Sequence, residues 1–100
     1  MNREQIISNL CQASKELFGY GVIEIGLFGS YVRNENNKDS DIDLLIDFAK
    51  GEETFDNFLA ATELLENLFE GYKVEVGTKK GLSLCIGPHV LKEVEYAKVA

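Results

Sequence analysis

The chain has 100 residues, 45% of them hydrophobic, and its 17 acidic and 10 basic residues give a formal net charge of −7. This length suits a single domain spanning residues 1–100 and leaves no room for a second, substrate-binding domain. The acidic balance disfavours direct nucleic-acid binding, because phosphate contacts need clustered Lys and Arg. No stretch approaches the roughly 18 uninterrupted apolar residues of a membrane span, so no membrane partner is expected.

The N-terminal segment and the cysteines bear on the cellular compartment. The segment MNREQIISNL lacks a basic start followed by a long apolar run, so no secretory signal is expected and cytoplasmic residence follows. Cys11 and Cys85 belong to no metal-binding spacing. We therefore expect two small buried thiols, with neither a zinc site nor a disulfide.

The first predicted elements are a helix and a strand. Apolar residues recur at helical spacing over residues 2–18 and predict an amphipathic helix that includes Phe18 in its buried stripe. The β-branched and apolar run over residues 22–28 predicts a core strand. Its buried face is expected to carry Ile23, Ile25 and Leu27.

A turn, a loop and a second strand follow. Ser30 is a suitable N-cap for a short helix over residues 31–33, and the Asn-rich segment 34–40 predicts an exposed loop. Strict alternation over residues 41–48 predicts a strand with one apolar and one acidic face. The apolar face comprises Ile42, Leu44, Ile46 and Phe48, and the other face comprises Asp41, Asp43, Leu45 and Asp47.

The rest of the chain predicts a helix, a strand and a last helix. Acidic residues at 52–56 begin a helix that extends to Gly71. Its apolar stripe comprises Phe55, Phe58, Leu59, Leu65, Leu68 and Phe69. Residues 72–76 predict a third strand with Glu75 on its polar face, and Pro88 is well placed to begin a final helix. That helix would carry Val90, Leu91, Val94 and Ala97.

The acidic face of the second strand suggests a metal site. Asp41 and Asp43 stand at positions i and i+2, so their side chains project the same way from Cα atoms about 6.5 to 7 Å apart. Both can reach one hard cation through oxygen, and Mg²⁺ suits such a site because it binds few protein carboxylates and completes its shell with water and phosphate. Alone, this pattern is also typical of a solvated strand face.

Gly29 and Ser30 change that balance. A turn that leaves a strand and enters a helix offers backbone N–H groups, a hydroxyl and a helix N-terminus, all of which attract phosphate. As an isolated dipeptide, Gly-Ser would be an ordinary capped turn. Together with the acidic pair, it predicts a site that binds a metal ion and a nucleotide at once.

The combined motif carries a resemblance. The stretch LFGSYVRNENNKDSDIDLLIDF has Gly-Ser, ten residues and Asp-x-Asp, and it resembles the DNA polymerase β-like nucleotidyltransferase superfamily. Within it, the length and the tail VEVGTKKGLSLCIGPHVLKEVEYA resemble the minimal nucleotidyltransferases, which are antitoxin partners of HEPN-domain toxins. The resemblance covers most of the chain. It implies an α+β fold with a small mixed sheet of three to four strands flanked by helices.

The resemblance also implies roles for individual residues. Gly29, Ser30 and Arg33 would bind the nucleotide, with ATP as the substrate. Asp41, Asp43 and Glu75 would be both the metal ligands, with two Mg²⁺ ions expected, and the catalytic residues.

Two positions depart from the pattern of the family. Asn34 stands where glycine is usual, although Asn tolerates a left-handed conformation. Glu75 stands where Asp is usual, and its extra methylene moves the carboxylate by about 1.3 Å, enough to disturb catalytic geometry. The second departure puts turnover in question more than nucleotide binding.

Other polar residues have simpler interpretations. Asp47 lies roughly 13 Å beyond Asp43 along the same strand, too far for a shared metal cluster. His89 has no evident metal or nucleophile partner in the sequence, and a surface or capping role is expected. Lys79 and Lys80 are expected in a solvated turn, with contact to phosphate or an acidic partner as the alternative.

Three functions are compatible with these residues. The resemblance implies a Mg²⁺-dependent antitoxin that transfers AMP from ATP to a tyrosine of a HEPN toxin. The departure at Glu75 leaves open an antitoxin that neutralises its partner by complex formation alone. Transfer to a small molecule such as an antibiotic is a third function, for which the additional substrate domain usual in such enzymes has no counterpart in the sequence.

Overall fold

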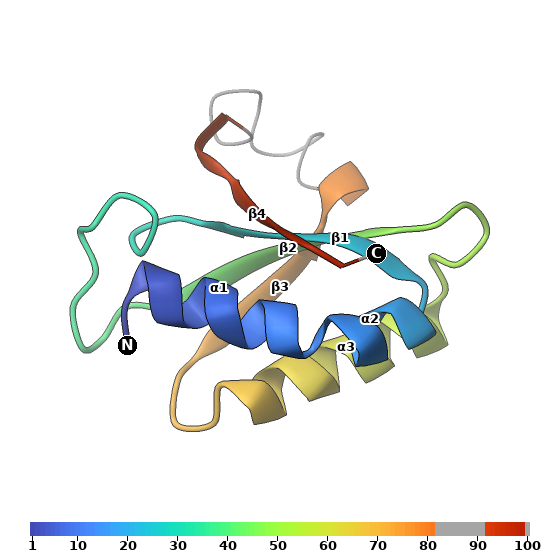
Figure 1. The fold of residues 1–100 in the computed structure, drawn as a ribbon, viewed down its shortest axis with the longest axis horizontal. Helices are drawn as coiled ribbons and strands as arrows, with labels where there is room; N and C mark the ends of the chain where they lie inside the picture. Colours follow the sequence, from blue (N-terminus) through green and yellow to red (C-terminus); the bar gives the residue numbers. More distant parts are fainter. Residues whose placement is uncertain (82–91, 100) are drawn as a thin grey trace.

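In the computed structural model of the chain, which describes residues 1–81 and 92–99, helices pack against one face of a four-stranded sheet. The elements in chain order are α1 (Arg3–Gln12), α2 (Ser14–Gly19), β1 (Val22–Phe28), β2 (Ile42–Phe48), α3 (Phe55–Leu68), β3 (Val74–Thr78) and β4 (Glu95–Lys98). Figure 1 shows α1, α2 and α3 together on one side of the sheet.

The sheet is mixed and has the strand order β3-β2-β1-β4. Strands β1 and β2 form an antiparallel pair, and β4 adds to the other edge of β1, also antiparallel. Strand β3 runs parallel to β2, which requires a crossover, and α3 provides it. The predicted α+β fold with a small mixed sheet is confirmed, and two middle strands carry the residues of the predicted motif.

Strand β2 shows the alternation that its sequence predicts. Ile42, Leu44 and Ile46 are fully buried in the core between the sheet and the helices, together with Phe48. Their neighbours on β2 point to the opposite face, where Leu45 is also buried. The strand is therefore held from both faces. A strand fixed in this way gives its polar side chains defined positions.

The predicted N-terminal helix is divided into two in the structure. Helix α1 ends at Gln12, and α2 starts at Ser14. Ala13 between them has a ψ of 1°, which departs from helical geometry. The break lets the chain follow the core, because Leu10 and Leu17 are both fully buried on either side of it. Phe18, which was expected in the buried stripe, is exposed at the end of α2.

Two further predicted apolar faces, on β1 and on α3, differ from those in the structure. The pairing of β1 with β2 shifts between Val22 and Glu24, so Val22 is buried and Ile23 is exposed, contrary to the expected register. In α3 the buried face is narrower than the predicted stripe. Phe55 is 76% exposed and Leu59 is also exposed, because only one side of α3 reaches the sheet.

The predicted final helix is wrong over residues 95–98, which form β4. Ala97 and Val99 are buried while Tyr96 is exposed, so the segment follows the two-residue period of a strand. Pairing with β1 satisfies the backbone edge that β1 would otherwise leave open. The predictions for Cys85, Pro88, His89, Val90 and Leu91 lie outside the described residues.

Two other expectations concern the surface. Cys11 is an exposed free thiol, not a buried one, because it lies on the side of α1 that faces away from the sheet. Of the helices that the structure describes, none has the length and apolar character to cross a membrane.

Candidate active site

The predicted carboxylates meet at one end of the sheet. Asp43 on β2 is the direct partner of Glu75 on β3, and Asp41 precedes the first residue of β2. Adjacent strands lie about 4.8 Å apart, so the two partners present their side chains on the same face. Glu75 is at the sheet edge and its side chain is 57% exposed, whereas Asp43 is half-buried. The structure thus brings together three acids that are separated by up to 34 positions in the sequence.

The environment of Asp43 is unfavourable for its negative charge. Burial raises the pKa of the Asp43 carboxyl above its ordinary value, and the charges of Asp41 and Glu75 raise it further. The guanidinium of Arg33 opposes this increase of the pKa, although with a smaller effect. A bound cation would relieve the same repulsion, and this is typical of acid clusters that act as ligands.

Gly29 joins the turn after β1 to the acidic cluster. Its φ of +82° lies in the left-handed region, and a Cβ atom at this position would collide with Oδ2 of Asp43. Only glycine meets both conditions without displacing the carboxylate. The Gly-Ser turn and the Asp-x-Asp strand therefore lie in contact, as the function predicted for them requires.

The segment after Gly29 forms a turn, and the short helix predicted over residues 31–33 is absent. The N–H groups of Val32 and Arg33 both donate to the carbonyl of Gly29, and the turn closes with Glu35 N–H donating to the Ser30 carbonyl. Asn34 adopts a left-handed φ of 56°, so it can take the place of the glycine that is usual in the family. Any phosphate attraction here must come from the turn, without the N-terminus of a helix.

Arg33 anchors this turn. Its Nε donates to Glu35 at 2.6 Å, and its Nη1 donates to Glu93 at 3.0 Å, just before β4. Both carboxylates raise the pKa of Arg33 through these hydrogen bonds. In this arrangement, Arg33 links the turn to the C-terminal part of the chain, and its side chain remains partly exposed.

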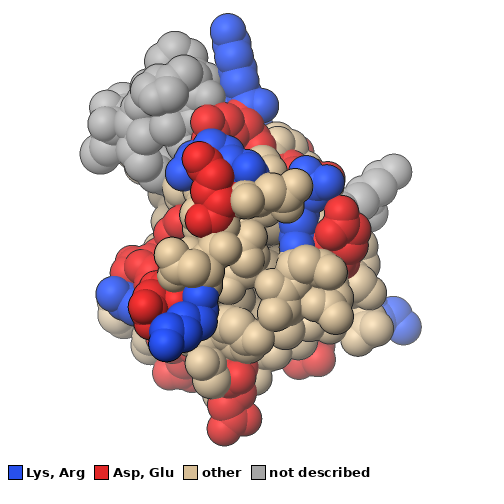
Figure 2. Space-filling view, turned by 90° about the vertical axis from the view of Figure 1, so that its left-hand side faces the viewer, with Lys and Arg blue, Asp and Glu red and all other residues tan. Residues whose placement is uncertain are grey.

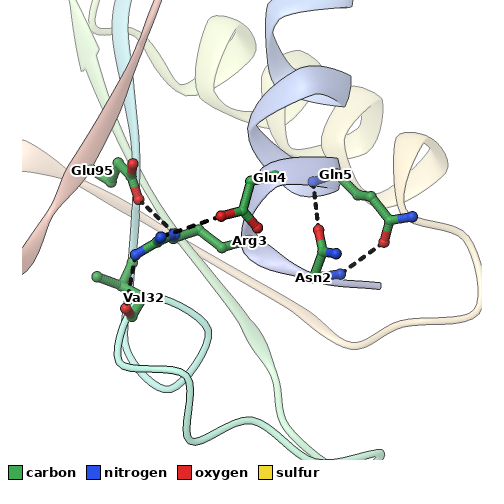
Figure 3. Close-up of polar contacts among 6 residues, drawn as sticks. All are labelled: Asn2, Arg3, Glu4, Gln5, Val32 and Glu95. Atoms are coloured by element: carbon green, nitrogen blue, oxygen red, sulfur yellow. Dashed lines mark hydrogen bonds and ion pairs between the residues drawn. The ribbon is translucent and has the colours of Figure 1, made fainter.

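A second arginine supports the turn and was missed in the sequence. Figure 3 shows Arg3 at the start of α1, with Nε 3.3 Å from the Glu95 carboxylate and Nη1 3.5 Å from the Val32 carbonyl. A capping box between Asn2 and Gln5 fixes this end of the helix. A cation in the first turn of a helix is unfavourable for the helix dipole, and this was the available signal that Arg3 has a tertiary role.

Lys73 lies within the acidic cluster and was also missed. Its Nζ is 3.8 Å from Oδ2 of Asp41 and 3.6 Å from Oε1 of Glu75. Among residues 1–81 and 92–99, no three acidic, histidine or cysteine side chains already converge on one position for an ion. Three carboxylates on neighbouring positions of two paired strands are nevertheless a suitable donor set for a hard cation, and the Lys73 ammonium lies near two of them. The chemistry of these donors therefore fits a divalent ion.

The surrounding surface has charges of both signs. Figure 2 shows acidic and basic side chains beside one another on the end of the molecule that lies on the left of Figure 1. Two hollows of about 390 and 480 Å³ share Met1 and Tyr72, but neither is lined by Asp41, Asp43 or Glu75. They lie beside α1 and the loop after β1, so we assign them no part in the chemistry.

Asp47 and Lys79 lie farther along the same face of the sheet. Asp47 pairs with Glu24 near the other end of β2, away from the acidic cluster, and its Oδ1 accepts from its own neighbour Phe48. Lys79 is not simply solvated, because its Nζ donates to Glu24 at 2.9 Å and lies 5.3 Å from the centre of the Tyr96 ring. Lys79 therefore neutralises acids at a distance from the proposed ligands.

Comparison with known proteins decides the family. The nucleotidyltransferase domain family matches residues 5–100, nearly the whole chain. The chain belongs to this family. Protein adenylyltransferase MntA of Thermococcus cleftensis is 44% identical over 94 residues, which cover 93% of each chain. A relative from Methanocaldococcus jannaschii, named provisionally as a protein adenylyltransferase, is 39% identical over 77 residues, or 76% of this chain and 73% of its own.

A solved structure supports the same assignment. It is described provisionally as a minimal nucleotidyltransferase, matches with a TM-score of 0.70 and 28% identity, and the match covers 95% of each chain. The predicted family, fold and enzyme class are thereby confirmed. In this nucleotidyltransferase the Gly-Ser turn follows β1 and the acidic pair lies at the start of β2, and these two central strands pair with each other over most of their length.

Proposed function

We propose that this nucleotidyltransferase is a Mg²⁺-dependent protein adenylyltransferase of the cytoplasm, which transfers AMP from ATP to a tyrosine of a partner HEPN-domain toxin. The name of its relative from Thermococcus cleftensis supports the reaction class. The observation that carries the proposal is the contact of Gly29 with Asp43, which in turn faces Glu75 on the next strand. The turn that would bind phosphate and the carboxylates that would bind the metal ion meet there.

Mg²⁺ would be held by Asp41, Asp43 and Glu75, with two ions as the expected number. When bound, it would neutralise the triphosphate and the developing charge on the leaving group. The raised pKa of Asp43 is consistent with this role, because a cation would offset the repulsion among the three acids. Asp43 is held most firmly, since it is half-buried on a strand fixed from both faces.

The other groups orient and deprotonate the reactants. The turn at Gly29 and Ser30 would bind the phosphates, and Arg33 would hold the turn through Glu35. The tyrosine hydroxyl oxygen would bond to the α-phosphorus while the bond from this phosphorus to the bridging oxygen breaks and pyrophosphate leaves. Glu75 is the exposed acid of the three, and its carboxylate would accept the phenolic proton.

Neutralisation by complex formation alone is the second candidate. It is favoured by Glu75, which replaces the usual Asp, lies on an edge strand and is paired with Lys73. A longer, mobile carboxylate gives less reliable catalytic geometry than a short one. Transfer to a small molecule is a weaker alternative, because none of the observations above favours an antibiotic pocket.

One experiment separates the first two candidates. The chain is incubated with ATP, Mg²⁺ and a HEPN-domain protein with which it forms a complex, and that partner is analysed by intact-mass spectrometry. We expect a gain of one or more AMP masses with the native chain and none with the Asp41→Asn, Asp43→Asn double variant, although the complex still forms. A partner that is neutralised without any mass gain would instead establish sequestration.

A further inference from the structure

Lys73 is the basic group that lies between two of the proposed ligands. Its Nζ is within 4 Å of both Asp41 and Glu75, at 3.8 and 3.6 Å, and the residue lies immediately before β3. These distances are longer than those of a tight hydrogen-bonded pair, and the Lys73 side chain is 72% exposed. The contact is therefore weak enough to be exchanged.

The position of Lys73 follows from the sheet. The Lys73 carbonyl accepts a hydrogen bond from the N–H of Ile42, the residue between Asp41 and Asp43. This bond fixes the Lys73 backbone beside both proposed ligands. Glu75 is two residues farther along the chain and projects to the same face. Only the flexible stem of Lys73 is free to move, and this allows its ammonium to stay near the acids or leave them.

A lysine in this position must act against a metal ion. Its ammonium offsets part of the repulsion among the acids when no metal is bound, but it repels a divalent cation that binds the same oxygens. Both charges compete for Asp41 and Glu75, and the metal ion can gain these ligands only if the ammonium moves away. The exposed stem makes this displacement possible without a change in the fold.

We propose that Lys73 is a built-in counter-cation, which holds the ligand carboxylates together in the metal-free protein and competes with the metal ion for them. The inference rests on the proposed metal site. Lys73 is thus a positioning residue that sets how tightly the protein binds its metal before nucleotide arrives.

The test measures metal affinity without nucleotide. Mn²⁺ is titrated into the protein, and the free ion is followed by electron paramagnetic resonance. Lys73→Gln should bind Mn²⁺ about three- to tenfold more tightly than the native chain, because one positive charge near the ion is removed. Lys73→Arg keeps the charge and should restore an affinity close to the native one.

Lys50→Gln is the matched control. It removes the same charge from an exposed lysine two residues beyond the C-terminal end of β2, far from the acidic cluster. Its affinity for Mn²⁺ should stay within about twofold of the native value, because the distance greatly exceeds the screening length. The gain in Lys73→Gln should also shrink at high salt, which a local packing effect would not do.

The outcomes separate this inference from the function on which it rests. If Lys73→Gln binds Mn²⁺ no more tightly than Lys50→Gln, or more weakly, the counter-cation role is wrong. If the native chain binds no Mn²⁺, or the Asp41→Asn, Asp43→Asn double variant binds it equally well, the metal site itself is wrong. Thermal unfolding of each variant checks that the substitution leaves the protein folded.

Discussion

The two ends of the sheet differ in the side chains that they expose, acidic at one end and apolar at the other. One end gathers three carboxylates, with Asp43 half-buried against the Gly29 turn. The other end, where β1 begins and β2 ends, has exposed apolar groups beside a hollow of about 250 Å³. That hollow is lined by Phe18, Gly19, Gly21, Ile23, Ala49 and Glu52. Only the first end combines unfavourable charge with a fixed backbone, which is typical of a functional site.

The comparison also distinguishes two kinds of glycine. Gly29 and Gly51 share a φ of +82°, but a Cβ at Gly29 would meet Asp43, whereas nothing lies within 4 Å of one at Gly51. At position 51, backbone conformation alone demands glycine. At position 29, conformation and the neighbouring Asp43 carboxylate both demand glycine, so variants at Gly29 and Gly51 can separate the two effects.

The largest expected effect is on turnover. Asp43→Asn should lower AMP transfer about a hundredfold or more, because it removes the best-held charge from the proposed ligand set. The rate is measured as pyrophosphate release in the presence of the partner protein. Asp47→Asn removes an acid from the same strand near its other end and should retain most of the rate. Equal losses in both variants would contradict the proposed site.

The next effect compares the two glycines by urea unfolding. Gly51→Ala should cost about 1 kcal/mol of unfolding free energy from its positive φ alone. Gly29→Ala should cost at least about 2 kcal/mol, because the new methyl group must also displace the Asp43 carboxylate. It should weaken Mn²⁺ binding as well, whereas Gly51→Ala should not. Equal stability of the two variants would mean that the contact with Asp43 is easily relieved.

A third prediction concerns stability and pH. Because the pKa of Asp43 is raised in the folded protein, its ionisation destabilises the fold as pH rises through that pKa. Asp43→Asn should therefore unfold at higher urea than the native chain at neutral pH without metal. The difference should vanish as pH falls below the ordinary value of 3.8, where Asp43 is protonated in both states. A native chain that is more stable than the variant at neutral pH would contradict this explanation.

The smallest effect belongs to the apolar end. Phe55 is 76% exposed, so Phe55→Ser should change the unfolding free energy by less than about 0.5 kcal/mol. Leu65→Ala on the same helix should cost about 2 to 5 kcal/mol, because Leu65 is fully buried. Urea unfolding of both variants checks the narrow buried face of α3. A large loss in Phe55→Ser would show that this face is wider than the structure indicates.

The sequence predicts the parts of the molecule that depend on local pattern. The alternation from Ile42 to Phe48 predicts β2 and its two faces, because a strand buried on one side must alternate. The Gly-Ser turn and the pair Asp41 and Asp43 are recognisable because their spacing lies within one hairpin. The left-handed conformation of Asn34 was allowed for by its residue type, and the structure adopts it.

Contacts between distant segments were harder to predict. The register of β3 against β2 depends on how α3 crosses the sheet, so only a family resemblance suggested that Glu75 joins Asp43. Strand β4 has too few residues for its two-residue period to be separated from a helical pattern, and pairing with β1 decides its structure. Lys73 was missed because a single lysine before a strand carries no local signal.

The central claim is that the acidic end of the sheet transfers AMP to a protein. The most direct test supplies the chain and the proposed HEPN-domain partner with ATP labelled at either the α- or the γ-phosphate, and measures the label on tyrosine of that protein. We expect label from the α-phosphate alone, and its loss in the Asp41→Asn, Asp43→Asn variant. Label from the γ-phosphate, or transfer that survives this double substitution, would contradict the proposed function.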